Sequence, residues 1–70
     1  MRSDRSILTP RESEILSLIT SGRTNREIGT ALAITEGTVK GHVSALLAKL
    51  HLGDRTQLAL FAVKHGFPGP

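Results

Sequence analysis

Apolar residues recur at the spacing of a helix in four segments of the chain. These sets are Ile15, Leu16, Leu18 and Ile19; then Ile28, Ala31 and Leu32; then Val39, Val43, Leu46, Leu47 and Leu50; and finally Leu58, Phe61 and Ala62. Residues three or four apart lie on one side of an α-helix, so the pattern predicts four helices that each bury one side. Valine and isoleucine never alternate with polar residues over a useful length, which predicts no strand and an all-α fold.

A residue that caps helix N-termini precedes each apolar set. Threonine or aspartate stands three residues before glutamate or glutamine in Thr9–Glu12, Thr24–Glu27 and Asp54–Gln57. This spacing is typical of a capping box, in which the two side chains each bond a backbone N–H group. Thr35, followed by Glu36, is the fourth predicted cap. Gly22 and Gly66 are predicted to end the first and last helices.

Only Ala33-Ile34-Thr35 separates the second predicted helix from the third, which is the spacing of a helix-turn-helix unit. In such a unit the second helix lies in the major groove of DNA. The side of residues 36–50 opposite the apolar stripe carries Gly37, Lys40, Gly41 and Ser44. Each glycine costs a helix interior about 0.8–1 kcal/mol relative to alanine. Close approach to the groove floor would offset this cost, although the glycine pattern alone is equally compatible with simple tolerance.

Length and composition restrict the chain to one small domain. Its 70 residues contain no cysteine, which excludes a disulfide framework and a thiolate zinc site. No apolar run approaches the roughly 20 residues that span a bilayer, so we expect a cytoplasmic protein without a membrane segment. The predicted organisation is a polar linker or disordered N-terminus at 1–7, a helix-turn-helix domain at 8–66 and a tail at 67–70. Residues 23–70 supply the whole net charge of +3, which suits a polyanionic partner.

Five spaced motifs run from residue 8 to residue 57: LTPRE at 8–12, GRTNREI at 22–28, TEGTVKGH at 35–42, KL at 49–50 and RTQ at 55–57. Together they resemble the LuxR-type (NarL/FixJ) DNA-binding domain, and the likeness extends to about residue 62. The resemblance implies four helices and sequence-specific binding to double-stranded DNA. It also implies the output domain of a bacterial transcription regulator, of the two-component response-regulator kind, that binds paired half-sites as a homodimer. An upstream receiver or sensor domain and RNA polymerase are further candidate partners.

The candidate DNA-binding residues lie in the second and third predicted helices. Lys40 can reach guanine or a phosphate, and Ser44 adds a short hydroxyl. By resemblance, Thr38 and His42 reach phosphates, although a partly buried packing role suits His42 equally well. The N-terminus of the second helix is expected to meet the DNA backbone. The full set is Thr24, Asn25, Arg26, Thr38, Lys40, Gly41, His42 and Ser44.

Four residues depart from the pattern of the resembling family, which usually has alanine at Gly29, a larger residue at Gly41, often asparagine at Ala45, and glycine at His51. We expect Gly29 to loosen the second helix. Gly41 and Ala45 leave only Lys40 and Ser44 able to hydrogen-bond bases. The sequence therefore predicts weak or shape-assisted recognition of the DNA sequence.

The remaining assignments concern assembly and stability. Leu60 and Val63 form a second apolar stripe on the last helix and are the candidate dimer residues, because the resembling family pairs its domains through this helix. Arg11 and Glu12 are interpreted as structural, with an ion pair to a later helix. Three cations, Lys49, Arg55 and Lys64, are interpreted as contributors to the positive field only.

Two other functional classes are an enzyme and a protein-interaction module. An enzyme is set aside because His42 and Ser44 face different directions on one helix, and no phosphate-binding glycine loop is present. The three histidines have no cysteine or carboxylate at ligand spacing, so no metal or cofactor is expected. A protein-interaction or sigma-factor-like adaptor with weak DNA binding remains the alternative. A steep loss of DNA affinity with salt would distinguish a DNA-binding domain from such an adaptor.

Overall fold

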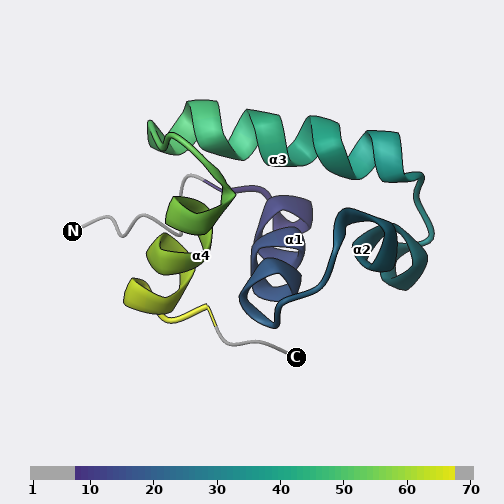
Figure 1. Cartoon of the computed structure of the whole chain (residues 1–70), viewed down its shortest axis with the longest axis horizontal. Coiled ribbons are helices and arrows are strands. Elements are labelled where there is room, and N and C mark those ends of the chain that lie inside the picture. Colours follow the sequence, from purple (N-terminus) through teal and green to yellow (C-terminus); the bar gives the residue numbers. More distant parts are fainter. Residues whose placement is uncertain (1–7, 68–70) are drawn as a thin grey trace.

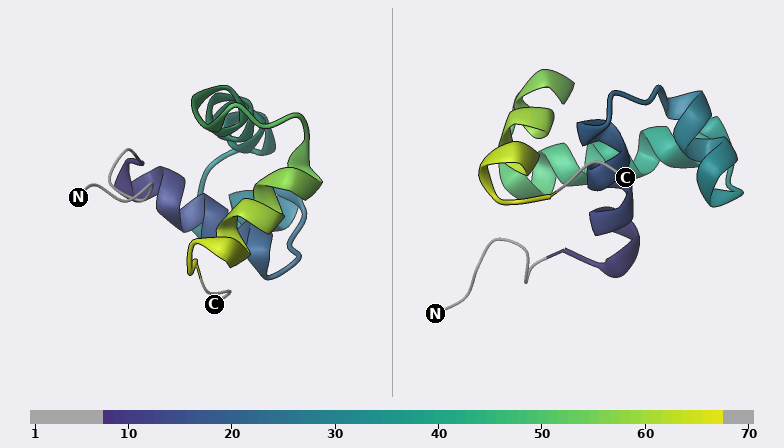
Figure 2. Two further views of the ribbon diagram at one scale, coloured as in Figure 1. Left: turned by 90° about the vertical axis from the view of Figure 1, so that its left-hand side faces the viewer. Right: turned by 90° about the horizontal axis from the view of Figure 1, so that it is seen from below.

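Four helices and no strand make up residues 8–67, the part of the chain that the computed structural model describes. They are α1 (Pro10–Thr20), α2 (Asn25–Leu32), α3 (Glu36–Leu50) and α4 (Arg55–Lys64). In Figure 1, α3 extends along one side of the molecule, and α1 lies below its middle with α4 and α2 to either side. Helix α1 packs against α4 and α3, whereas α2 packs mainly against α3 (Figure 2). The predicted all-α fold is confirmed.

The helices begin where the capping residues predict. The Thr9 hydroxyl accepts the Glu12 N–H at 3.1 Å, and the Glu12 carboxylate accepts the Thr9 N–H at 2.9 Å. Helix α4 differs from this pattern. Asp54 accepts the Gln57 N–H at 3.0 Å, but the Gln57 side chain accepts its bond from Gly53. Asp54 is more extended than Thr9, with φ of −156° against −73°, so the chain enters α4 from a different direction.

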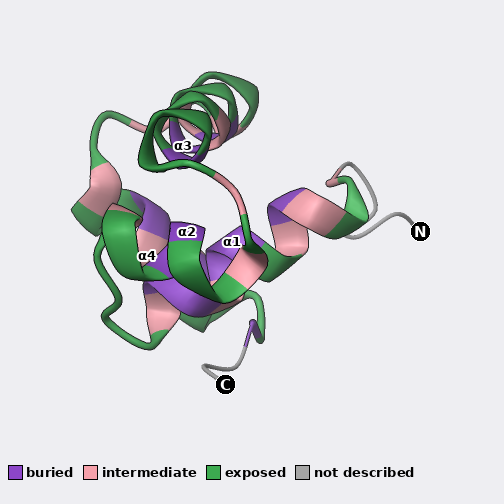
Figure 3. Ribbon diagram, turned by 90° about the vertical axis from the view of Figure 1, so that its right-hand side faces the viewer, coloured by how far each residue is buried: buried purple, intermediate pink, exposed green. Residues whose placement is uncertain are grey.

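The core contains side chains from all four helices. Its fully buried members are Ile15, Leu16, Ile28, Val39, Leu46 and Leu58. Figure 3 views α3 nearly end-on and shows that its inner side is buried and its outer side exposed. Phe67 also belongs to the core, with only 2% of its surface exposed, which corrects its assignment to a tail. Gly66 has φ of +75°, which turns the chain back so that the Phe67 N–H donates to the Ala62 carbonyl at 2.8 Å. The predicted linker at 1–7 and residues 68–70 lie outside the described residues.

The turn between α2 and α3 packs directly on Gly29. The Ile34 N–H donates to the Gly29 carbonyl at 2.9 Å, and Ala33 adopts the left-handed conformation with φ of +58°. A Cβ atom on Gly29 would lie only 2.7 Å from the Ile34 carbonyl oxygen. Such a distance is far inside van der Waals contact, so the glycine permits the close approach of the turn. This packing role replaces the expectation that Gly29 merely loosens α2.

One ion pair joins α1 to α3. The Lys49 ammonium donates to the Glu12 carboxylate at 2.8 Å, and the Glu12 side chain is only 9% exposed. Burial alone would raise the pKa of Glu12, but the hydrogen bonds from Lys49 and from the Thr9 N–H outweigh burial and lower it. The predicted ion pair of Glu12 with a later helix is therefore confirmed. The interpretation of Lys49 as a field contributor only is wrong.

Candidate nucleic-acid interface

The outer side of α3 is a smooth surface with one long cation. Gly37, Lys40, Gly41 and Ser44 are all exposed, whereas Val39 and Val43 are buried, so the predicted division of this helix into two sides is confirmed. A Cβ atom on Gly41 would meet no heavy atom within 4 Å. In the described part of the chain, no side-chain hydrogen bond or ion pair involves Lys40 or Ser44. Their polar groups are therefore available to a ligand.

The start of α3 is held by two hydroxyl groups. The Thr35 hydroxyl accepts the Thr38 N–H at 3.0 Å, and the two hydroxyl oxygens lie 2.8 Å apart. The Thr38 side chain is exposed beside this cap. His42, one turn further along, is half-buried, so it can both pack against the domain and present a ring edge to a ligand.

The N-terminus of α2 is a polar surface organised by its capping box. The Thr24 hydroxyl accepts the Glu27 N–H at 3.1 Å, and the Glu27 carboxylate accepts the Thr24 N–H at 2.8 Å. This hydrogen bond from the Thr24 backbone lowers the pKa of Glu27. The Thr24 hydroxyl keeps its own proton for donation, and the Arg26 side chain is exposed. A shallow hollow of about 280 Å³ beside them is lined by Arg23, Arg26, Glu27, Thr30 and Ala31.

Asn25 is joined to the last helix. Arg55, the first residue of α4, donates one hydrogen bond to the Asn25 side-chain oxygen and another to the Arg23 carbonyl. The interpretation of Arg55 as a field contributor only is therefore wrong. Sequence reasoning missed this contact because its partners lie 30 and 32 residues away, and no local pattern relates residues so far apart.

Several cations near the starts of α2, α3 and α4 have no carboxylate partner among the described residues. Within residues 8–67, the ion pairs are Arg11–Glu14 and Lys49–Glu12. Arg26, Lys40 and Arg55 are in neither pair. The acidic residues nearest to them in sequence are Glu27, Glu36 and Asp54, which lie in the first turns of α2 and α3 and at the N-cap of α4, where the helix dipole favours negative charge. The charge distribution thus favours a polyanionic ligand.

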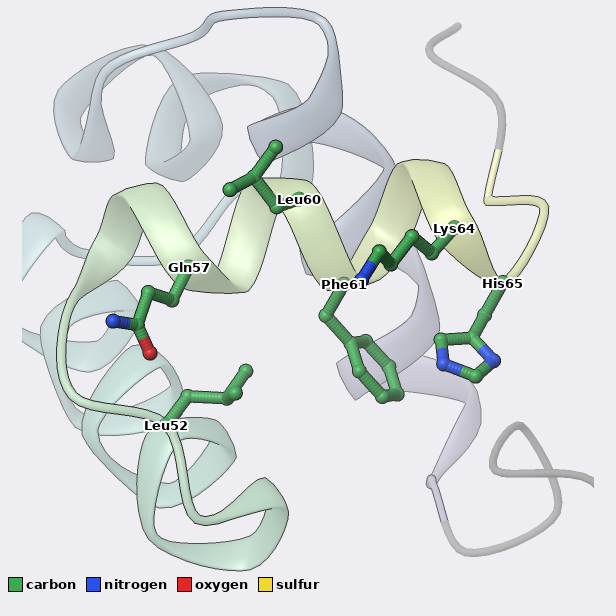
Figure 4. A pocket seen from close by; sticks show the side chains of 6 residues that line it. All are labelled: Leu52, Gln57, Leu60, Phe61, Lys64 and His65. Atoms are coloured by element: carbon green, nitrogen blue, oxygen red, sulfur yellow. The ribbon is translucent and has the colours of Figure 1, made fainter.

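A separate apolar surface lies on α4. Leu60 and Val63 are 58% and 65% exposed, as their stripe in the sequence predicts. Leu60 borders a shallow hollow of about 300 Å³ together with Leu52, Gln57, Phe61, Lys64 and His65 (Figure 4). The rings of Phe61 and His65 lie side by side there, with their centroids 4.3 Å apart.

Residues 8–67 contain no helix that is long and apolar enough to cross a membrane. In the same part of the chain, no group of three or more histidine, aspartate or glutamate side chains is placed to hold a metal ion.

Comparison with known proteins places the chain in a family. The family model described as bacterial regulatory proteins of the luxR family matches residues 6–62. The chain is 58% identical over 62 residues to an uncharacterized transcriptional regulatory protein, YhcZ, of Bacillus subtilis, covering 89% of this chain and 29% of that protein. It is 50% identical over 66 residues to the transcriptional regulatory protein DegU of Brevibacillus brevis, covering 94% of this chain and 28% of that protein.

A third relative is a response regulator. The chain is 52% identical over 59 residues to the response regulator protein VraR of Staphylococcus aureus, covering 84% of this chain and 28% of that protein. The chain thus spans less than a third of the length of these relatives. The family match covers most of the chain, including α1, α2, α3 and most of α4. The chain therefore belongs to the LuxR family of bacterial regulatory proteins and is a DNA-binding helix-turn-helix domain of that family.

Proposed function

We propose that the domain binds duplex DNA with the outer side of α3 in the major groove. The observation that carries the proposal is the exposed Lys40, which has no side-chain partner among the described residues and stands between Gly37 and Gly41. Small residues on both sides let the helix axis approach the bases, and the lysine then supplies one cationic donor. Ser44 adds a hydroxyl one turn further along. Thr38 and His42 contact phosphates at the edge of the groove.

The N-terminus of α2 contacts the DNA backbone. Thr24, Asn25 and Arg26 all stand in its cap or first turn, where backbone N–H groups point outward and the helix dipole favours an anion. Arg26 adds a charge that its exposed side chain can place on a phosphate. These contacts set the orientation of the domain, whereas Lys40 and Ser44 read the sequence.

The domain acts as the output part of a transcription regulator, as a binding module and not as an enzyme. Relatives of three to four times its length include a response regulator, which supports a receiver domain upstream and a place in a two-component system. Such a regulator works in the cytoplasm on chromosomal DNA, with RNA polymerase as a further partner. The exposed Leu60 and Val63 on α4 support a homodimer that forms on paired half-sites.

The test begins with selection of bound duplexes from a random-sequence library by the 70-residue chain. Binding to a selected duplex is then measured by fluorescence anisotropy across a series of salt concentrations. Lys40→Ala should weaken specific binding by about 1–3 kcal/mol if Lys40 contacts a base. Lys64→Ala is the matched control, because this lysine is exposed at the far end of α4. Equal affinities of the two variants would remove Lys40 from the interface.

Salt dependence separates the proposal from its alternative. A protein that neutralises phosphates loses affinity steeply as salt rises, because bound counterions are released on association. Failure to enrich any duplex, or affinity that does not change with salt, would favour a protein-interaction or sigma-factor-like adaptor.

A further inference from the structure

We propose that Arg55 is a positioning residue for the DNA-contacting N-terminus of α2. Its guanidinium holds the Asn25 side-chain oxygen and the Arg23 carbonyl at once, so that the Asn25 amide nitrogen is presented to a phosphate oxygen of the duplex. This inference rests on the proposed function of the domain. It assigns a role in DNA binding to a residue that lies outside the helix-turn-helix unit.

The contact joins two helices that otherwise scarcely touch. Helix α2 packs mainly on α3, and α4 packs mainly on α1. The two bonds of Arg55 therefore supply a direct polar link between the start of α4 and the segment that leads into α2. Arginine suits this role because its planar fork of donors can reach two acceptors in a fixed geometry. A lysine at the same position has one compact ammonium group and cannot reproduce the fork.

The position of Arg55 does not stabilise α4. It is the first residue of α4, directly after the Asp54 cap, where the helix dipole disfavours a cation. Both of its acceptors are neutral oxygens, and no carboxylate of the described residues pairs with it. A polar or acidic residue would suit the start of α4 better. The position of Arg55 is thus explained by the two oxygens that it holds.

The link determines what Asn25 can offer to a ligand. A side-chain amide has an oxygen that accepts and a nitrogen that donates two protons. Because Arg55 occupies the oxygen, the orientation of the amide is fixed, and its nitrogen is left as the donor. Asn25 is the first residue of α2, so this donor stands beside the backbone N–H groups of the helix start. Phosphate oxygens accept both kinds of donor.

The main test is Arg55→Lys, which keeps the charge and removes the fork. Affinity for a duplex selected by the wild-type chain should fall about tenfold, as expected when a hydrogen bond to a charged group is lost. The slope of log affinity against log salt should stay unchanged, because the number of cations is the same. Arg11→Lys is the matched control, since Arg11 lies on α1 and pairs with Glu14. Thermal unfolding of each variant checks that binding is measured on folded protein.

A double-mutant cycle tests whether Arg55 acts through Asn25. Asn25→Ala alone should also weaken binding about tenfold, and the double variant should be no weaker than Asn25→Ala. Asn25→Ala leaves α4 untouched and so remains informative if Arg55→Lys does not fold. The NMR signals of the Asn25 side-chain amide should move in Arg55→Lys without DNA present. This signature reports the link itself, independently of DNA binding.

The outcomes are distinguishable. Wild-type affinity in Arg55→Lys, or losses that simply add in the double variant, would overturn the inference while leaving the proposed function intact. A salt slope that falls by about 0.9 in the neutral variant Arg55→Gln would show Arg55 itself on a phosphate, and would also overturn its role as a positioning residue. If the wild-type chain selects no duplex, the proposed function fails and the inference fails with it, whatever the amide signals show.

Discussion

Replacing Gly41 with alanine tests two effects of this glycine separately: its cost to the stability of α3 and its proposed role in DNA binding. Gly41 is exposed inside α3, and a Cβ atom there would meet no heavy atom within 4 Å. The added methyl group therefore causes no clash within the domain. The variant should gain the full difference in helix propensity, about 0.8–1 kcal/mol. In a domain of this size that gain corresponds to a rise in melting temperature of roughly 4–8 °C.

DNA affinity should change in the opposite direction. If α3 rests against the groove floor at Gly41, the methyl group overfills a close contact. Overpacking of this kind costs about 1–3 kcal/mol, so affinity for a selected duplex should fall by about fivefold or more. The predicted signature is thus a more stable protein that binds DNA less tightly.

The assay combines thermal unfolding followed by circular dichroism with anisotropy titration on the same duplex. Ser13→Ala in α1 is the control, because it raises helix propensity outside the proposed interface and should leave affinity unchanged. Higher stability with undiminished affinity would refute the groove role of the glycine. Unchanged stability would refute the reasoning from helix propensity.

Three further variants test other parts of the structure. Glu12→Ala should destabilise the fold by about 1.5–3 kcal/mol in urea unfolding, because it removes the charged bond from Lys49 and half of a capping box. The lowered pKa of Glu12 means that its stabilisation is present at neutral pH and is lost as the pH falls below about 4.5, so wild type and variant should converge in acid. His51→Gly should raise stability by about 1 kcal/mol, because His51 ends α3 in the left-handed conformation with φ of +58°; a lower melting temperature would contradict this. Val63→Glu should leave the fold and single-site DNA binding unchanged and abolish cooperativity on paired sites in gel shifts, and retained cooperativity would exclude α4 as the dimer surface.

The helix starts and most of the inner side of each helix could be predicted from the sequence because their causes are local, although Ala31, predicted to face inward from α2, is exposed. Thr9, Thr24 and Thr35 each bond a backbone N–H three residues ahead, so the signal and the structure lie within one helical turn. The exposed side of α3 follows from the period of its apolar residues. The positions of Lys40 and Ser44 could be predicted for the same reason.

The tertiary polar contacts could not be placed in the same way. The Lys49–Glu12 pair spans 37 residues, and the Arg55–Asn25 contact spans 30. Which long side chain meets which partner depends on how the helices pack, and several cations in this chain have similar surroundings in the sequence. The role of Gly29 could not be predicted for a related reason. A glycine is needed there because the Ile34 carbonyl of the following turn packs against it, and this contact depends on how α2 and α3 are arranged. Phe67 stands alone between glycine and proline, so no periodicity in the sequence predicts its burial.

The two sides of α3 carry separate tasks, and this division makes the helix open to redesign. Its inner side is committed to the core through Val39, Val43 and Leu46. Its outer positions 37, 40, 41, 44 and 45 are exposed, so side chains there can be exchanged without disturbing packing. The contacts that pack the turn between α2 and α3 on Gly29 involve none of these outer positions. Randomising these five positions on the unchanged scaffold should yield a library of folded domains that differ in DNA preference. Regulators that do not bind one another's DNA sites could be selected from this library.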